Sequence, residues 1–304
     1  MATTSSLPDA SNASRLGPTR LLQKFEPLTY DRYWRYGLLR PDTQYAFYRN
    51  VNSAPIGVSE FAQISAHLPI VFMDDDKQHP YVVLGLLPHI NLALSHKDVW
   101  RTGLYQPNYI RLYPFGSIVL QEQRTEGVFS DSVPIPEDQD SMSHNKTLLA
   151  IDTSTPLLVP MQNNPDATPL FEQDGSVTPV VTQMIALQST LKRDQVATSS
   201  FLAAMRANKL LSEKSIKIHF DDNTTLTVSG FSTISRTKFN QLSPTVIERW
   251  KELGYLSLIE HHWNSQKKWG LLIALHERRM SRDLRALRKK RGAMPPFTSP
   301  DTQI

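Results

Sequence analysis

One short pattern in the chain could hold a metal ion, the tripeptide His219-Phe220-Asp221. A histidine and an aspartate at this spacing form part of the two-His-one-carboxylate site that binds iron in oxygenases, where a later histidine completes the site. Later histidines are present here, among them His262. This set of residues predicts, as the alternative function, a metalloenzyme of the iron/2-oxoglutarate or cupin type.

The elements expected around these residues argue against such a site. Iron sites of this type sit in a barrel, with several strands between the first and last ligands, whereas the chain after Asp221 offers one strand and then helices. His262 and His276 would lie roughly 21 Å apart on one helix, too far to share an ion. The sequence therefore favours no bound metal and no cofactor, with His219 as a strand residue and Asp221 at the start of a turn.

A second kind of chemistry is binding, suggested by the aromatic stretch LYQPNYIRLYPF at residues 104–115. If residues 108–113 form a strand, the tyrosines and the arginine within it share one face, and Pro114 marks a strand end or a sheet edge. An edge of this kind can accept an extended peptide by strand addition. The candidate binding residues are the aromatic and guanidinium side chains of this region: Trp100, Tyr105, Tyr109, Arg111 and Tyr113.

The opposite interpretation is that this face is covered. In that case the tyrosines pack under the C-terminal helices, and Arg111 forms an internal ion pair. The sequence leaves both interpretations open.

Composition restricts the class of protein. Hydrophobic residues make up 40% and charged residues 20% of the 304 positions, typical of a soluble globular protein. The absence of cysteine excludes disulfides, thiolate nucleophiles and Cys-ligated metal centres. No apolar run approaches the length of a transmembrane helix, and residues 1–20 lack the apolar core of a signal peptide. These features predict a cytoplasmic protein.

Most of the positive charge lies in one segment. Residues 277–291 hold eight Lys/Arg and two Asp/Glu, a balance of +6, so the remaining chain carries −2 of the total +4. Met280, Leu284 and Leu287 form a narrow apolar stripe beneath these charges. The segment predicts an anionic partner, either nucleic acid or a membrane surface, or else a solvated helix end.

Short strand-like runs dominate residues 40–152. These runs are rich in β-branched and aromatic residues and are bounded by turn-forming residues: 45–49, 69–73, 81–87, 108–113, 116–121 and 147–152. A helical spacing of apolar residues predicts a helix over 57–68. Residues 153–169 are predicted to be a long connection.

Helices dominate residues 170–276. The predicted elements are helices over 179–194 and 198–212, a β-hairpin over 215–230, and a long helix from 256 towards 290. Ser243 and Pro244 have the residue types preferred at the start of a helix, and Gly254 the type preferred at its end.

Several stretches carry a family signature. They are Ser59-Glu60-Phe61, Leu68-Pro69-Ile70-Val71-Phe72, Leu84-Gly85, Asn91-Leu92, the block from Trp100 to Phe115, Leu170-Phe171 with Asp174-Gly175, and the segment from Gly254 to Ser265. Together, over about residues 25–275, they resemble the bacterial SapC family, which is linked to surface-layer proteins. One departure is that Leu112 follows Arg111 where many relatives have a second arginine.

The resemblance implies a non-catalytic accessory or binding protein with a protein or peptide partner. It links the chain to the export, uptake or modification of peptides or surface-layer proteins, and it implies no catalytic residues.

The predicted fold class is α+β, with a β-rich N-terminal part and a helical C-terminal part that contains one hairpin. Residues 1–20 are predicted to be disordered. Residues 21–276 are predicted to form a single SapC-like domain, β-rich over 40–152 and mainly helical over 170–276, whose two parts share one core. Residues 277–304 are predicted to be a basic helical extension and a disordered tail.

Overall fold

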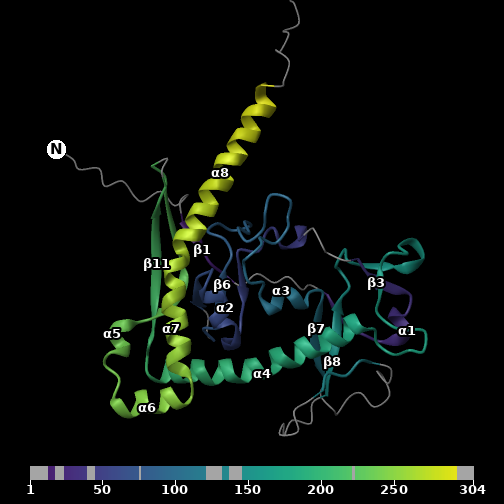
Figure 1. The fold of residues 1–304 in the computed structure, drawn as a ribbon, viewed down its shortest axis with the longest axis horizontal. Coiled ribbons are helices and arrows are strands. Elements are labelled where there is room, and N and C mark those ends of the chain that lie inside the picture. Colours follow the sequence, from purple (N-terminus) through teal and green to yellow (C-terminus); the bar gives the residue numbers. More distant parts are fainter. Residues whose placement is uncertain are drawn as a thin grey trace, which may run out of the picture.

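The computed structural model describes residues 13–17, 24–39, 45–74, 77–120, 132–136, 146–220 and 223–292. The fold is α+β, as predicted, with most strands in the first half and most helices in the second (Figure 1). The long helix α4 (Pro179–Ala207) runs along one side of the molecule. Helices α7 (Tyr255–Ser265) and α8 (Trp269–Gly292) run across its direction, and α8 extends beyond the body.

The largest sheet has the strand order β1-β12-β5-β6-β4, and β11 pairs with β12. Its strands are β1 (Ala13–Arg15), β4 (Ser53–Pro55), β5 (Ile70–Met73), β6 (Pro80–Val83), β11 (Leu211–His219) and β12 (Thr225–Ile234). The pair β1–β12 is parallel and the other described pairs are antiparallel. The strands predicted near 69–73 and 81–87 and the hairpin near 215–230 are confirmed, although β6 is shorter and the hairpin longer than predicted.

Strand β1 corrects part of the predicted N-terminal disorder. Ala13 pairs with Thr227, and Leu16, directly after the strand, is buried. The Ser53 hydroxyl donates to the carbonyl oxygen of Gly17 at 3.0 Å. This pairing and burial order residues 13–17 despite their polar composition. The other residues of the predicted disordered segment 1–20 lie outside the described ranges.

Two smaller antiparallel sheets complete the β structure. One has the order β2-β8-β7 and the other β10-β3-β9. Their strands are β2 (Phe25–Pro27), β3 (Tyr36–Leu38), β7 (Phe115–Leu120), β8 (Lys146–Asp152), β9 (Leu158–Pro160) and β10 (Thr168–Pro169). The strands predicted near 116–121 and 147–152 are confirmed. The predicted connection 153–169 contains β9, β10 and a short 3₁₀ helix, η5 (Met161–Asn163).

Short helices connect the sheets. They are α1 (Tyr30–Tyr33), η2 (Ala46–Tyr48), η3 (Val58–Glu60), α2 (Phe61–Ser65), α3 (Asn108–Leu112), α5 (Arg236–Phe239), α6 (Pro244–Glu252) and η6 (Gln266–Lys268). The predicted helix start is confirmed, since the Ser243 hydroxyl accepts a hydrogen bond from the Val246 amide at 3.4 Å. Gly254 follows α6 with a φ of 73°, the left-handed conformation expected at a helix end.

Two strand predictions are wrong. Residues 45–49 contain η2, and residues 108–113 contain α3. In each segment a distant side chain binds the backbone. The Asn91 side-chain amide donates to the Tyr48 carbonyl oxygen at 3.1 Å, and the buried carboxylate of Glu60 accepts the Asn108 amide at 2.7 Å. These tertiary bonds outweigh the local preference of aromatic residues for strands.

Helix boundaries also differ from the prediction. The two helices predicted over 179–194 and 198–212 form one helix, α4, which ends at Ala207 and is capped by Asn208. Its interior hydroxyl groups donate to carbonyl oxygens four residues back, so they do not interrupt it: Thr182, Ser189, Thr190 and Ser200. The predicted long helix from 256 is divided by η6 into α7 and α8.

The buried apolar side chains form two clusters, and α4 contributes to both. The first cluster joins residues of the β-rich part, such as Phe72, to residues of the helical part, such as Phe201 of α4. The second is built around the β2-β8-β7 sheet and includes Val181 of α4. Between these anchors α4 carries polar residues, including Asp194 and Thr198. The middle of α4 therefore lies over the junction of the two clusters.

Candidate functional site

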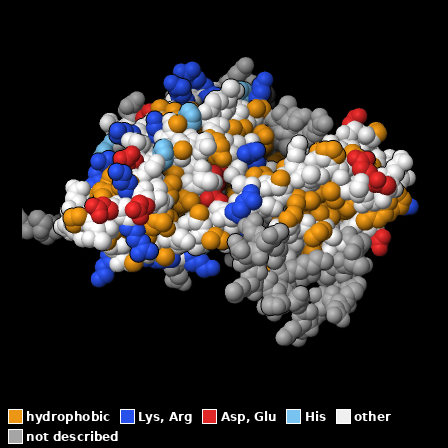
Figure 2. Space-filling model, turned by 60° about the horizontal axis from the view of Figure 1, so that its bottom comes forward, with side chains coloured by type: hydrophobic (Ala, Val, Ile, Leu, Met, Phe, Trp, Pro, Cys, Tyr) orange, Lys and Arg blue, Asp and Glu red, His pale blue; other side chains and the backbone are white. Residues whose placement is uncertain are grey.

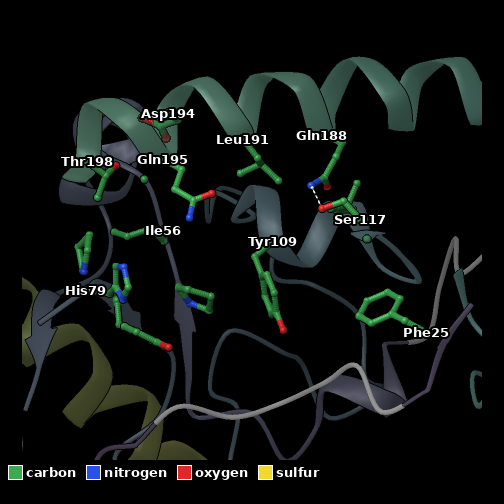
Figure 3. Close-up of a pocket in the computed structure, with 16 residues that line it drawn as sticks. Phe25, Ile56, His79, Tyr109, Ser117, Gln188, Leu191, Asp194, Gln195 and Thr198 are labelled. Carbon is green, nitrogen blue, oxygen red and sulfur yellow. Dashed lines mark hydrogen bonds between the residues drawn. The ribbon is translucent and has the colours of Figure 1, made fainter. Parts of the chain in front are cut away.

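A cleft of about 410 Å³ lies below the middle of α4, at this junction. It is lined by Pro55 of β4 and Ser117 of β7, so the largest sheet and the β2-β8-β7 sheet border it from different sides. Tyr109 enters it from α3, and Phe25 lies near β7 (Figure 3). Its volume falls in the range of small-ligand and side-chain binding sites.

One face of α4 forms a wall of the cleft. Gln188, Leu191, Gln195 and Thr198 recur at intervals of three and four residues and line the cleft together. The first three project from the helix into the cleft (Figure 3). None of these four residues is among the predicted binding residues, although glutamines at helical spacing within a long helical pattern were a usable signal.

Gln188 has an unused hydrogen-bond acceptor at the cleft. Its side-chain amide donates from Nε2 to the Ser117 hydroxyl at 2.9 Å. Its Oε1 atom is buried and has no hydrogen-bond partner among the described residues. A buried carbonyl oxygen without a partner is costly. Because this atom is shielded from solvent, the exposed side-chain amide of Gln195 is the one that a bound molecule can reach.

Asp194 and Thr198 fasten α4 to the segment after β4. Asp194 accepts hydrogen bonds from the amide and the hydroxyl of Ser59, at 3.0 and 2.7 Å. The Thr198 hydroxyl accepts the Val58 amide at 3.0 Å. These bonds satisfy amides at the start of η3 and set the distance between α4 and the largest sheet, which determines the width of the cleft.

Glu60 positions α3 on another side of the cleft. The side chain is 1% exposed. Its Oε1 accepts the Asn108 amide at 2.7 Å and the Tyr105 hydroxyl at 3.2 Å, and its Oε2 accepts the Gly57 amide at 3.1 Å. Burial raises the pKa of Glu60, and these hydrogen bonds act in the opposite direction. The carboxyl group thereby fixes the start of α3, from which Tyr109 reaches the cleft.

The predicted binding residues do not form one face. Tyr109 lines the cleft. Tyr105 belongs to the group around Glu60, and Arg111 donates to the side-chain oxygen of Asn108 at 3.0 Å. The shared strand face of the tyrosines and Arg111 is wrong because the segment is helical. This partner of Arg111 is an uncharged side-chain amide, and the predicted internal ion pair is not found in the described part of the chain.

The other two predicted residues lie in an aromatic cluster. The Trp100 indole donates to the Leu104 carbonyl oxygen at 3.1 Å, and its ring centroid lies 6.2 Å from that of Tyr45. Tyr113 stacks on Phe47 at 4.7 Å. Both side chains are half-buried against the first hydrophobic cluster. Their role in binding stays a prediction.

The alternative metal site has no support in the structure. His262 is fully buried, and its Nε2 accepts the Ile234 amide at 3.1 Å, which occupies that nitrogen. His219 lies on an exposed part of β11, with Nδ1 3.2 Å from the Thr225 hydroxyl. Asp221 lies outside the described residues. Within the described ranges no group of three or more His, Asp or Glu side chains could hold a metal ion.

The structure thus defines an α+β protein whose described strands form three sheets and whose long helix α4 covers a ligand-sized cleft. The SapC family model matches residues 34–272, well over half of the chain, so the protein belongs to the SapC family. No curated protein and no solved structure matches the chain. Among the helices that the structure describes, none is long and apolar enough to cross a membrane.

The arrangement around Glu60 gives a testable prediction. In the wild type the Glu60 carboxylate accepts hydrogen bonds from three donors. In Glu60→Gln an NH₂ group replaces one carboxylate oxygen, so it faces at least one of these donors and loses that hydrogen bond. We expect the free energy of unfolding to fall by about 1–3 kcal/mol, measured by urea denaturation. Glu213→Gln, on an exposed position of β11, is the control and should change stability by less than about 0.5 kcal/mol. Equal stabilities of the two variants would contradict the assignment.

Proposed function

We propose that this SapC family member is a non-catalytic accessory protein that binds an extended peptide or protein segment in the cleft below α4. The export, uptake or modification of peptides or surface-layer proteins is the setting we propose for this binding. The observation that carries the proposal is the ligand-sized, largely apolar cleft below α4, with the exposed side-chain amide of Gln195 in its wall. A peptide supplies backbone groups that can pair with such an amide and apolar side chains for the walls.

The borders of the cleft also favour a peptide. In the described sheets, β4 and β7 are each the last strand of their strand order, and residues of both line the cleft. A terminal strand keeps one row of backbone donors and acceptors free for an added strand. Pro55 in β4 has no amide to donate, so β7 is the edge better suited to main-chain pairing.

The surface around the cleft is consistent with an apolar partner. On the face that holds α4, apolar side chains gather over the half of the molecule with β7, β8 and the N-terminal part of α4 (Figure 2). Lysines and arginines lie mainly over the other half and along the upper edge. A segment with alternating apolar and small polar residues fits this distribution.

Fluorescence polarisation with a labelled octapeptide of alternating valine and threonine tests the proposal. We expect saturable binding, and a loss of at least about tenfold in affinity for Leu191→Arg, which places a charge in the cleft. Gln195→Ala should also weaken binding, with less risk to folding. Val196→Arg, on an exposed position of the same helix, is the matched control and should bind as the wild type does.

A second peptide separates main-chain pairing from simple apolar contact. The same octapeptide with alternate backbone nitrogens methylated cannot donate along one edge, and we expect it to bind at least about tenfold more weakly. If both peptides fail to bind, or if Leu191→Arg and Val196→Arg behave alike, the proposed peptide site is wrong.

A further inference from the structure

Two arginines, one in the first half of α8 and one in the loop after Leu92, bind the same short stretch of backbone. Arg279 donates from Nη1 to the carbonyl oxygen of Asn91 at 3.3 Å. Arg101 donates from Nε to the carbonyl oxygen of Leu92 at 2.8 Å. Because these carbonyl groups belong to consecutive residues, both guanidinium groups are anchored on the same short piece of backbone.

Further arginines surround this pair. Burial lowers the pKa of Arg101, and the positive charges of Arg282, Arg278 and Arg279 lower it further. An open groove along α8 is lined by Arg278, Arg282 and Arg285. The small side chains of Ala274 and Ser281 also line it. The positive charges therefore continue from the loop onto the exposed side of the helix.

Three carboxylates lie near these arginines. Asp283 lies 3.9 Å from Arg279 and 3.5 Å from Arg282, and Glu277 lines the groove. Asp98 is also close enough to Arg279 for the guanidinium to lower its pKa, but Asp98 is paired with Arg49. In the described ranges, Arg101, Arg278 and Arg285 form no ion pair. Five guanidinium groups that repel one another in so small an area are stabilised when an anion of high charge density binds between them.

We propose that this arginine surface, made of Arg101, Arg278, Arg279, Arg282 and Arg285, binds the phosphate backbone of a nucleic acid. Guanidinium groups offer two parallel N–H donors that match phosphate oxygens. Arg278, Arg282 and Arg285 follow one face of α8 over roughly 10 Å, so they reach successive phosphates. The helix continues beyond the body, which leaves room for a long polyanion (Figure 1).

The described side chains favour nucleic acid over a membrane surface. Helices that lie in a bilayer interface bury a broad apolar face. Leu272 and Leu275 of α8 are buried in the protein core, and Leu271, at 38% exposure, is the large apolar side chain that the described part of α8 exposes. Ala274 and Ser281 complete the groove without adding apolar bulk.

The test is fluorescence anisotropy of the full chain with a labelled duplex of about 20 base pairs and mixed sequence. We expect binding that weakens as salt rises from about 50 to about 200 mM, with log K falling linearly against log salt. Arg101→Ala and Arg282→Ala should each weaken binding several-fold and reduce the slope by about 0.9 per lost phosphate contact. Arg193→Ala, on an exposed position of α4 outside the arginine surface, is the matched control and should bind as the wild type does.

Other outcomes overturn the proposal. Binding to vesicles that contain phosphatidylserine without binding to DNA would assign the arginines to a membrane surface. Tight binding of inorganic pyrophosphate without binding to DNA would indicate a site for a small phosphorylated molecule. An unchanged salt slope in Arg101→Ala would remove that residue from the site, and no binding to any of these probes would show that the surface is only solvated.

Discussion

Replacing His262 by glutamine is expected to remove about 2 kcal/mol of the destabilisation that the protein undergoes between about pH 7 and about pH 5. Burial lowers the pKa of His262 from 6.5 to about 3. In the unfolded chain the His262 imidazole therefore takes up a proton near pH 6.5, whereas in the folded chain it stays neutral until the pH is much lower. The stabilising contribution is complete above that pH, and it is lost progressively as the pH falls from 6.5 towards 3.

The structural reason is that the imidazole is fully buried and has, within the described ranges, no group nearby that would stabilise its charged form. Its Nε2 accepts the Ile234 amide, so the ring is neutral with its proton on Nδ1, and the ring lies 5.2 Å from that of Phe72. Nδ1 is buried and has no partner among the described residues. A second proton would create an unpaired charge inside the first hydrophobic cluster.

Urea denaturation of wild type and His262→Gln at several pH values measures the effect. The comparison uses the pH dependence, so a uniform loss of stability caused by the substitution does not disturb it. His261→Gln, the neighbouring residue on the same helix with a partly exposed ring, is the matched control and should keep the wild-type profile. Identical profiles for wild type and His262→Gln would show that another group accounts for acid unfolding.

Adding one methyl group at Gly57 should destabilise the protein by about 3–5 kcal/mol. A Cβ atom at Gly57 would lie 1.6 Å from Oδ2 of Asp194, so the carboxylate must move. Moving it breaks both hydrogen bonds to Ser59, which fasten α4 above the cleft. The φ of Gly57 is −97°, so the loss comes from missing space and not from backbone strain.

Gly270→Ala is the matched control for this prediction. Gly270 lies in α8 with no atom within 4 Å of an added Cβ, and alanine there should stabilise the helix by up to about 1 kcal/mol. Asp194→Ala makes space at Gly57, so Gly57→Ala in that background should cost much less than in the wild type. Additive effects of the two substitutions would contradict the close packing of Asp194 on Gly57.

Local patterns in the sequence were sufficient for many elements. The apolar strands β5 and β8, the hairpin of β11 and β12 and the capped start of α6 follow from residues within a few positions of one another. The family motifs likewise point to the SapC family without any structural information, and the family model confirms it. The strands and the helix start depend on short local patterns, the hairpin on a turn between adjacent strands, and the family on motifs that are read without any contact between them.

The helix α3 shows where local patterns fail. Residues 108–113 have a strand-like composition, yet Glu60, 48 positions earlier, accepts the Asn108 amide and helps to fix the start of a helix. The strand face on which the predicted peptide surface depended therefore does not exist. Tyr109 reaches a cleft, while Arg111 turns back to Asn108.

By itself the sequence determined the α+β class, half of the described strands, the caps of α6 and the family, because periodicity, turn residues and motifs can be read along the chain. Only the tertiary structure decided that α4 is one helix across two hydrophobic clusters and that a cleft lies beneath its polar middle. The bonds that place α4 join residues as far apart as Ser59 and Asp194, separated by 135 positions. Such contacts leave no periodic signal in one sequence, since they depend on packing that brings distant segments together.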